Sequence, residues 1–274
     1  MAGSDEKQPN DGAFDVVVTG YDNVYPAVAA SPTFTRLWAL HACGADFPPA
    51  FAHISFLTFV ELRAMLEYLA LEKGEVLVDL ACGAGGPGLW VASQSGASLI
   101  GVDPSATGLA EARKRAERVG LADRAHYQHG TFAATGLPDD SADGAFSVDA
   151  IQYAADKRAV FAEARRILRP GARFAFSAFE LEPERVRDLP VFGVDPVPDY
   201  GPLLEEAGFA VDSYRESDGW LDRVRTTFAA VMETMPTLIE EMGEMAAASL
   251  GAEASITLKV EPYRRRVVVD AVAL

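Results

Sequence analysis

The passage from a short apolar run into a glycine-rich loop at residues 76–88 constrains the fold more than any other feature. Val76–Ala81 is apolar except for Asp79, which is typical of a strand buried in a parallel sheet. The glycines that follow, from Gly83 to Gly88, let the backbone turn sharply and approach a ligand closely. Pro87 suits the first turn of the next helix, where its missing N–H costs little. A strand, a tight turn and a helix N-terminus in this order predict a nucleotide-type binding corner.

Strand and helix patterns alternate from this corner to the end of the chain. Apolar runs predict strands at 75–81, 98–103, 125–129, 144–149, 172–178, 210–214 and 267–273. Helical patterns lie at 87–95, between Asp103-Pro104 and Gly120, at 157–168 and at 203–207. This alternation predicts an α/β fold with a doubly wound, mostly parallel, seven-stranded Rossmann-like sheet and helices on both faces.

Helical segments before and within this core divide the chain. The predicted parts are a disordered polar tail at 1–12, a helical N-terminal lid at 13–72, the core at 73–215 and 263–274, and a helical cap at 216–262. The cap is therefore inserted before the last strand.

The lid and the cap carry clear helix signals. Ser31 followed by Pro32 predicts an N-cap and the first helical position. A second lid helix is predicted from Thr58 to Leu71, with Gly74 as its C-terminal cap. Pro236 is expected to kink or divide the helical pattern of the cap. The cap also holds four of the six methionines, which either pack in an ordinary core or form an adaptable apolar lid over a ligand.

Charge and cysteine usage narrow the classes of partner and compartment. The chain has 40 acidic and 24 basic residues and a formal net charge of −16, so nucleic acid and anionic membranes are not expected as partners. The two cysteines, Cys43 and Cys82, do not form a disulfide framework, and the sequence shows no signal peptide or membrane-spanning run. A cytoplasmic monomer or homodimer is expected. No residues have convincing metal-ligand spacing, so no metal is expected.

The acidic residues at the strand ends select the ligand. The spacing of Gly83, Gly85 and Gly88 also matches a dinucleotide fingerprint, but Asp79 would repel a pyrophosphate and would attract a cationic amino group. Asp103 ends the second strand, where its carboxylate can accept hydrogen bonds from two ribose hydroxyls. S-adenosyl-L-methionine (SAM) has both an ammonium group and a ribose diol, so SAM is favoured over a nicotinamide dinucleotide.

With these features the chain resembles the class I SAM-dependent methyltransferases, in the small-molecule branch found in bacterial natural-product pathways. The resemblance is carried by four stretches, namely Val78-Asp-Leu-Ala-Cys-Gly-Ala-Gly85, Ile100-Gly-Val-Asp-Pro-Ser105, Leu137-Pro138 with Ser141-Ala-Asp143, and Leu168-Arg-Pro-Gly171. It implies SAM as cofactor, S-adenosyl-L-homocysteine as product and a set of cofactor-binding residues. These residues are Tyr21, Tyr25, Asp79, Ala81, Gly83, Gly85, Asp103, Pro104, Thr131, Phe132 and Ser147.

Three positions depart from the pattern of the family. Ala81 stands where the first glycine of the loop is usual, and alanine is the least disruptive replacement. Thr131 stands where an acidic residue commonly meets the adenine amino group, and its hydroxyl can accept one hydrogen bond. The histidines and the aspartate that serve some relatives as a base correspond here to Gln152-Tyr153 and Ala178. A base is therefore missing from the expected positions.

Three residues remain as candidates for contact with the methyl acceptor. His53 lies in the lid loop after Pro48-Pro49, and loops over a rigid scaffold often carry function. Gln152 and Tyr153 follow the fourth strand and are expected to position the acceptor by hydrogen bonding. Asp149 and Glu180 are reserve carboxylates near the same edge of the sheet.

The sequence thus predicts a SAM-dependent methyltransferase that acts on a small, largely apolar metabolite, as in natural-product biosynthesis. The acceptor is expected between the core, the lid and the cap, and its methylated atom is left open among oxygen, nitrogen and carbon. Three rival hypotheses are kept: a cyclase that binds SAM without transferring methyl, a nicotinamide-dependent oxidoreductase, and a ligand-binding regulatory protein.

Overall fold

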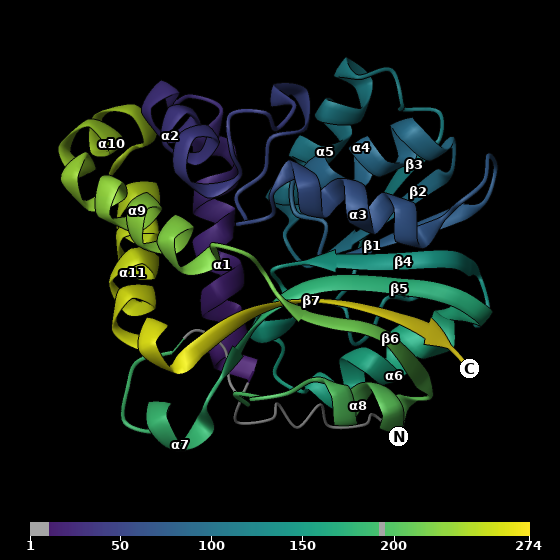
Figure 1. Cartoon of the computed structure of the whole chain (residues 1–274). Helices are drawn as coiled ribbons and strands as arrows, with labels where there is room; N and C mark the ends of the chain where they lie inside the picture. The colour runs from purple at the N-terminus through teal and green to yellow at the C-terminus, as the bar shows by residue number, and fades with distance from the viewer. Residues whose placement is uncertain (1–10, 192–194) are drawn as a thin grey trace, which may run out of the picture.

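A seven-stranded mixed sheet organises the protein (Figure 1). The computed structural model describes residues 11–191 and 195–274. The strands are β1 (Val76–Leu80), β2 (Ser98–Asp103), β3 (Ala125–His129), β4 (Ala142–Val148), β5 (Leu168–Leu181), β6 (Phe209–Glu216) and β7 (Arg264–Ala273). Their order is β3-β2-β1-β4-β5-β7-β6, and only β7 runs antiparallel to its neighbours β5 and β6. The predicted doubly wound, mostly parallel sheet is confirmed.

Helices cover both faces of the sheet because the central strands are apolar on both sides. Leu77 and Leu99 face a core shared with α3 (Phe59–Leu69), α4 (Gly86–Ser95) and α5 (Ala106–Arg118). Val78 and Leu80 face a second core shared with α6 (Lys157–Ile167) and α8 (Gly201–Ala207). All four leucine and valine side chains are fully buried, as the apolar run of the first strand predicts.

The remaining helices gather at the end of the sheet where the parallel strands terminate (Figure 1). They are α1 (Asp11–Val28), α2 (Pro32–Leu37), η1 (Trp38–Ala42), η2 (Pro49–Phe51), α9 (Trp220–Glu233), α10 (Met235–Met242) and α11 (Glu244–Val260). A third core centred on Phe34, Trp38, Phe56 and Phe228 joins the lid to the cap. Short helices α7 (Pro183–Val186), η3 (Ile151–Tyr153) and η4 (Glu261–Tyr263) lie in the connections.

Most local helix signals are confirmed. Ser31 caps α2, with its Oγ accepting a hydrogen bond from the N–H of Phe34 at 3.0 Å. Pro236 divides the cap as expected, because α9 ends before it and α10 begins at Met235. The prediction for Gly74 is wrong: α3 ends at Leu69, and its C-cap is Ala70, which adopts the left-handed conformation at φ 46°.

Of the predicted tail at 1–12, residues 1–10 lie outside the described residues. Residues 11 and 12 belong to α1. In the cap, Met232 and Met245 are exposed and Met242 is buried in the lid–cap core. These cap methionines therefore either pack in the core between lid and cap or face solvent.

Candidate active site

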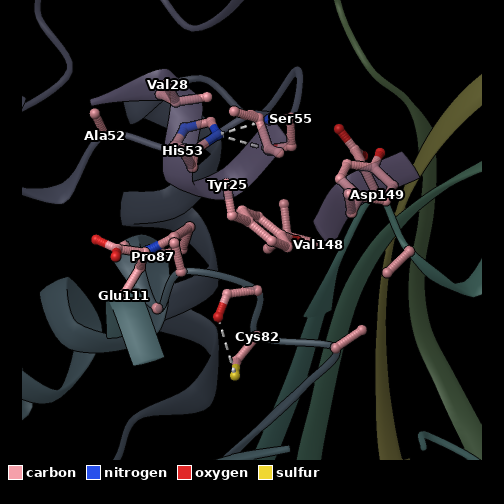
Figure 2. A pocket seen from close by; sticks show the side chains of 18 of the residues that line it. Tyr25, Val28, Ala52, His53, Ser55, Cys82, Pro87, Glu111, Val148 and Asp149 are labelled. Carbon is pink, nitrogen blue, oxygen red and sulfur yellow. Dashed lines mark hydrogen bonds between the residues drawn. The ribbon is translucent and has the colours of Figure 1, made fainter. Parts of the chain in front are cut away.

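A cavity of about 430 Å³ lies where β1, β2 and β4 end, beneath α1 and the 49–55 loop (Figure 2). Its wall is largely apolar on the lid side, where Val17, Phe34, Trp38 and Phe47 line it. It brings together most of the residues predicted from the sequence. These are Tyr21, Tyr25, His53, Asp79, Ala81, Gly83, Gly85, Asp103, Pro104, Phe132 and Tyr153.

The glycine loop forms the floor of this cavity through left-handed backbone turns. Ala81, Gly83 and Gly85 have φ angles of 61°, 51° and 74°. A Cβ atom at Gly83 would lie 2.4 Å from the hydroxyl of Tyr25. At Gly86 it would lie 2.3 Å from the carbonyl oxygen of Phe51 in the lid. The glycines are needed because the lid packs directly on the loop.

Asp79 is a buried carboxylate without a partner among the described residues. Only 3% of its surface is exposed. A Cβ atom added at Gly88 would lie 2.5 Å from Asp79 Oδ2. Burial, together with the negative charge of Asp103, raises its pKa well above the ordinary value. No hydrogen bond or ion pair within 11–191 and 195–274 compensates this group, so the site fits a cationic or N–H-donating ligand.

Asp103 is held in place by the turns on either side of it. Its Oδ2 accepts a hydrogen bond from the N–H of Gly83 and its Oδ1 accepts one from the N–H of Ser105, both at 2.8 Å. Burial raises its pKa to about 6, although the two hydrogen bonds act in the opposite direction. Each carboxylate oxygen keeps a second lone pair, so Asp103 can accept two hydrogen bonds from a diol.

Helix α1 is fastened to this floor by Asp22 and Tyr25. The Asp22 carboxylate accepts hydrogen bonds from Ser105 Oγ at 2.5 Å and from Thr107 Oγ1 at 2.6 Å. Tyr25 projects into the pocket toward the glycine loop (Figure 2), and its ring would also meet a Cβ on Gly108 at 2.9 Å. The lid residues predicted to approach the cofactor therefore lie directly on the loop.

Three predicted residues do not line the large cavity. Thr131 forms an isolated bridge with Ala134. The buried Ser147 uses its hydroxyl to donate a hydrogen bond to the carbonyl oxygen of Leu80 at 2.8 Å. Gln152 lines a smaller neighbouring cavity and donates to the carbonyl oxygen of Asp149. Their roles in binding or catalysis stay predictions.

His53 lines the large cavity as a neutral side chain. Its Nδ1 accepts a hydrogen bond from the N–H of Ser55 at 3.1 Å, which places the ring proton on Nε2. Burial and the positive charges of Arg115 and Arg266 lower its pKa to about 3. Within the described part of the chain Nε2 is buried without a partner. His53 can thus donate a hydrogen bond but is poorly suited to accept a proton.

Asp149 anchors the lid loop to the sheet. Its Oδ2 accepts a hydrogen bond from the N–H of Phe56 at 2.8 Å, and its Oδ1 accepts one from Ser177 Oγ at 2.7 Å. The fully buried Arg266 of β7 pairs with Asp149 at 2.9 Å and with Glu61 at 2.8 Å. Sequence reasoning kept Asp149 only as a reserve carboxylate, because nothing local marks a pairing with a strand 117 residues later.

A second cavity of about 40 Å³ adjoins the first and contains a carboxylate that sequence reasoning missed. Tyr21 and Tyr153 line both cavities, with their hydroxyl oxygens 3.2 Å apart. The Tyr153 hydroxyl donates to Glu253 Oε1 at 3.5 Å, and burial raises the pKa of Glu253 to about 7. The guanidinium of Arg264 lies nearby, 3.6 Å from the centre of the Phe179 ring. Glu253 belongs to the cap, whose polar helical positions give no local sign of which ones are buried.

Neither a metal site nor a membrane span is found in the part of the chain that the structure describes. There, no group of three or more His, Cys, Asp or Glu side chains is placed to hold a metal ion. Across the same residues, every helix is too short or too polar to cross a bilayer.

The sheet order, the glycine turn and the two strand-end aspartates define a class of Rossmann-like proteins that bind a nucleoside-type ligand at the strand ends. A family model described as "Methyltransferase domain" matches residues 78–176. Residues 78–176 thus carry a methyltransferase domain, and the chain is similar to the class I SAM-dependent methyltransferases.

Curated relatives match mainly in this domain. Methyltransferase phqN from Penicillium fellutanum is 34% identical over 38% of this chain and 32% of its own length. Methyltransferase GfsG from Streptomyces halstedii is 27% identical over 66% of this chain and 68% of its own length. The chain spans about a third of the length of most of the first curated relatives that it matches.

Solved structures share the fold over more of the chain. The [4+2]-cyclase SpnF superposes with a TM-score of 0.72 at 18% identity, covering 94% of this chain and 95% of that one. Other structures with the same fold contain SAM or S-adenosyl-L-homocysteine. At these identities the likeness concerns the fold alone.

Proposed function

We propose that the protein is a SAM-dependent methyltransferase that acts on a small, largely apolar metabolite. The observation that carries this proposal is the buried, unpartnered carboxylate of Asp79 at the edge of the cavity. An ammonium group is the ligand chemistry that compensates such a charge, whereas a pyrophosphate would be repelled. The methyltransferase family that the chain resembles uses a donor with this group, and the donor supplies a methyl group already activated on a sulfonium sulfur.

Six of the predicted residues on the cavity have a binding role in this proposal. Asp79 holds the ammonium group, and Asp103 accepts hydrogen bonds from the ribose hydroxyls. Gly83 and Gly85 let the ligand approach the backbone, because a side chain there would collide with the lid or the floor. The ring of Phe132 can pack on the adenine, and Tyr25 closes the lid over the loop.

The lid side of the cavity indicates the acceptor. Phe34, Trp38 and Phe47 present large apolar surfaces there, which favour a largely apolar molecule. The cap, predicted as the third wall, supplies none of the described residues that line the large cavity and lines the smaller one instead. Both cysteines are buried free thiols, which suits the cytoplasm, and we propose that the enzyme acts there as a monomer or homodimer.

Calorimetric titration tests the cofactor. SAM and S-adenosyl-L-homocysteine should bind the purified protein, and NADH should not. Asp103→Ala should weaken SAM binding by at least tenfold without unfolding the protein, because two diol hydrogen bonds to a charged group are lost. The exposed Asp123→Asn is the matched control and should leave the affinity unchanged. Preference for NADH over SAM would overturn the proposal.

A SAM-binding cyclase is the second candidate. It is favoured by the likeness to the [4+2]-cyclase SpnF over nearly the whole chain and by the largely apolar lid side of the cavity. The two functions differ in one product, since only methyl transfer releases S-adenosyl-L-homocysteine. Turnover of an acceptor without that release would select the cyclase.

A further inference from the structure

The cluster of Tyr21, Tyr153 and Glu253 links the two cavities. The three side chains come from α1, η3 and α11, which are far apart in the sequence. Both tyrosines line the large cavity and the small one, whereas Glu253 lines only the small one. The hydroxyls lie 3.2 Å apart, and that of Tyr153 donates to the Glu253 carboxylate at 3.5 Å. A proton can therefore pass from the large cavity to Glu253 through a tyrosine hydroxyl.

The surroundings of Glu253 suit it to accept a proton near neutral pH. The titratable and charged groups that share its cavity are Tyr21, Tyr153, Arg264 and Asp149. Burial raises the pKa of Glu253 to about 7, while Arg264 acts in the opposite direction. The pKa values of both tyrosines are raised by burial, so their hydroxyls stay protonated and can relay a proton. Asp149 is already paired with an arginine of β7.

A purely structural tie between the cap and α1 does not account for this arrangement. Glu253 is half-buried, and partial removal of a carboxylate from water costs free energy unless an ion pair and hydrogen bonds compensate it. Glu253 makes no ion pair with Arg264, and Arg264 Nε is buried without a partner among the residues that the structure describes. A carboxylate kept near its titration point beside a cavity is typical of a functional group.

We propose that Tyr153, assisted by Tyr21, and Glu253 form the proton-accepting relay of the enzyme, and that the methyl acceptor is a hydroxyl or phenol. This inference rests on the proposed methyltransferase function and supplies the base that is absent from the family's usual positions. The acceptor oxygen forms a bond to the methyl carbon as the bond between that carbon and sulfur breaks. The acceptor proton passes to the Tyr153 oxygen, and the Tyr153 proton passes to Glu253 Oε1.

Infrared titration tests the relay without any ligand. The wild-type protein should show a carboxylic acid that titrates near pH 7, and Glu253→Gln should lose that signal. Glu240→Gln, which changes an exposed glutamate of α10, should keep it. Because burial also raises the pKa values of Asp79 and Asp103, the test is the wild-type spectrum minus that of Glu253→Gln. A difference spectrum without a carboxylic acid that titrates near pH 7 would overturn the proposal.

Kinetics test the role in catalysis, with SAM and a panel of small phenols, aliphatic alcohols and primary amines as probes. In the wild type, S-adenosyl-L-homocysteine release with hydroxyl compounds should rise with pH and level off near 7. Glu253→Gln should lower kcat by about 10²-fold or more, leave KM for SAM unchanged and remove the rising limb. Tyr153→Phe, which keeps the ring, should give the same loss, and Glu240→Gln should match the wild type.

The possible failures are distinguishable. Unchanged kcat and pH profile in Glu253→Gln, with SAM still bound and hydroxyl compounds still methylated, would overturn the relay alone. Methylation of amines without any hydroxyl compound, or no turnover of the panel by a wild type that binds SAM, would overturn the acceptor class. A wild type that does not bind SAM would overturn the proposed function itself.

Discussion

The two sides of the cavity are built by different means. The floor is a strand, a turn and a helix start from one stretch of chain, and its shape is set by backbone angles at Ala81, Gly83 and Gly85. The roof consists of side chains from segments far apart in the sequence, such as Tyr21 and Tyr153. A local backbone motif can be recognised from the sequence, whereas a roof assembled by long-range packing cannot.

A few charged side chains, most of them buried or half-buried, connect the floor to the roof. Arg266 ties the sheet to Glu61 of α3 and to Asp149, which in turn holds the lid loop at Phe56. Asp22 ties α1 to the start of α5. The lid is thus positioned by specific polar contacts, so its position over the floor depends on a few named residues.

The largest expected effect on stability comes from Arg266→Met, which breaks the main connection between floor and roof. The substitution leaves Asp149 buried without its counter-ion and leaves Glu61 with only Arg223 at 3.8 Å, and we expect a loss of about 3–5 kcal/mol in the free energy of unfolding. Chemical denaturation measures it. Arg187→Met removes an arginine from an exposed pair with Glu184 and should cost less than about 1 kcal/mol. Similar values for the two variants would show that the buried network does not join the two sides.

Asp79→Asn should separate binding from stability. Removal of the charge should weaken SAM binding by about 2–5 kcal/mol, because the ammonium group loses its partner. The same change should raise the thermal unfolding midpoint of the protein without ligand, since a buried, uncompensated carboxylate disappears. Calorimetric titration and thermal denaturation give the two values. A fall in both would mean that Asp79 supports the fold of the floor and does not merely hold a ligand.

The sequence was sufficient to predict the floor because its determinants are local. The strand containing Asp79, the strand ending in Asp103 and the glycines between them were predicted within a few residues of where the structure has them. Tyr21 and Tyr25 were placed at the site through the family resemblance, and both lie on the cavity. Their roles toward the cofactor stay predictions.

The sequence was insufficient wherever long-range packing decides. Glu253 lies on a helix whose polar residues look alike, and the packing of α11 against α1 leaves this one half-buried. Ser147 ends a buried strand, but its hydroxyl is used by the neighbouring strand. Gly74 was predicted as the C-terminal cap, yet α3 ends at Leu69 with Ala70 as its left-handed C-cap, which nothing in the structure explains. For Glu253 and Ser147 a distant contact outweighs the local signal.

Gly86→Ala probes the place where floor and roof meet. Gly86 has no positive φ, so the substitution acts only through its Cβ, which would lie 2.3 Å from the Phe51 carbonyl oxygen and 2.7 Å from that of Ala52. The lid loop must move, at a cost of about 1–3 kcal/mol. We expect weaker S-adenosyl-L-homocysteine binding and faster amide hydrogen exchange in the 49–55 loop. Unchanged exchange would show that the loop does not rest on the floor. Gly120→Ala, at a position with open space but positive φ, separates backbone strain from collision.

Asp103 makes the stability of the ligand-free protein depend on pH. Its folded pKa of about 6 lies above the ordinary value of 3.8, so folding favours its protonated form. This stabilisation is present in acid and is lost as the pH rises from about 4 through 6, by up to about 3 kcal/mol. Unfolding free energies of the wild type minus those of Asp103→Asn should show the loss across that window. A difference that does not vary between pH 4 and 7 would contradict the raised pKa.

Ala81→Gly should have the smallest effect. It tests whether the alanine that departs from the family's glycine pattern affects stability or ligand affinity. Alanine at a φ of 61° is strained by roughly 1–2 kcal/mol, but glycine increases the entropy of the unfolded chain and offsets about half of the gain. A stabilisation of at most about 1 kcal/mol is expected in chemical denaturation. Ala70→Gly, at a φ of 46° and far from the cavity, should give a similar value and leave S-adenosyl-L-homocysteine affinity unchanged. If Ala81→Gly alone alters that affinity, the methyl group of Ala81 contacts the ligand, and the floor recognises its ligand through a side chain as well as through backbone shape.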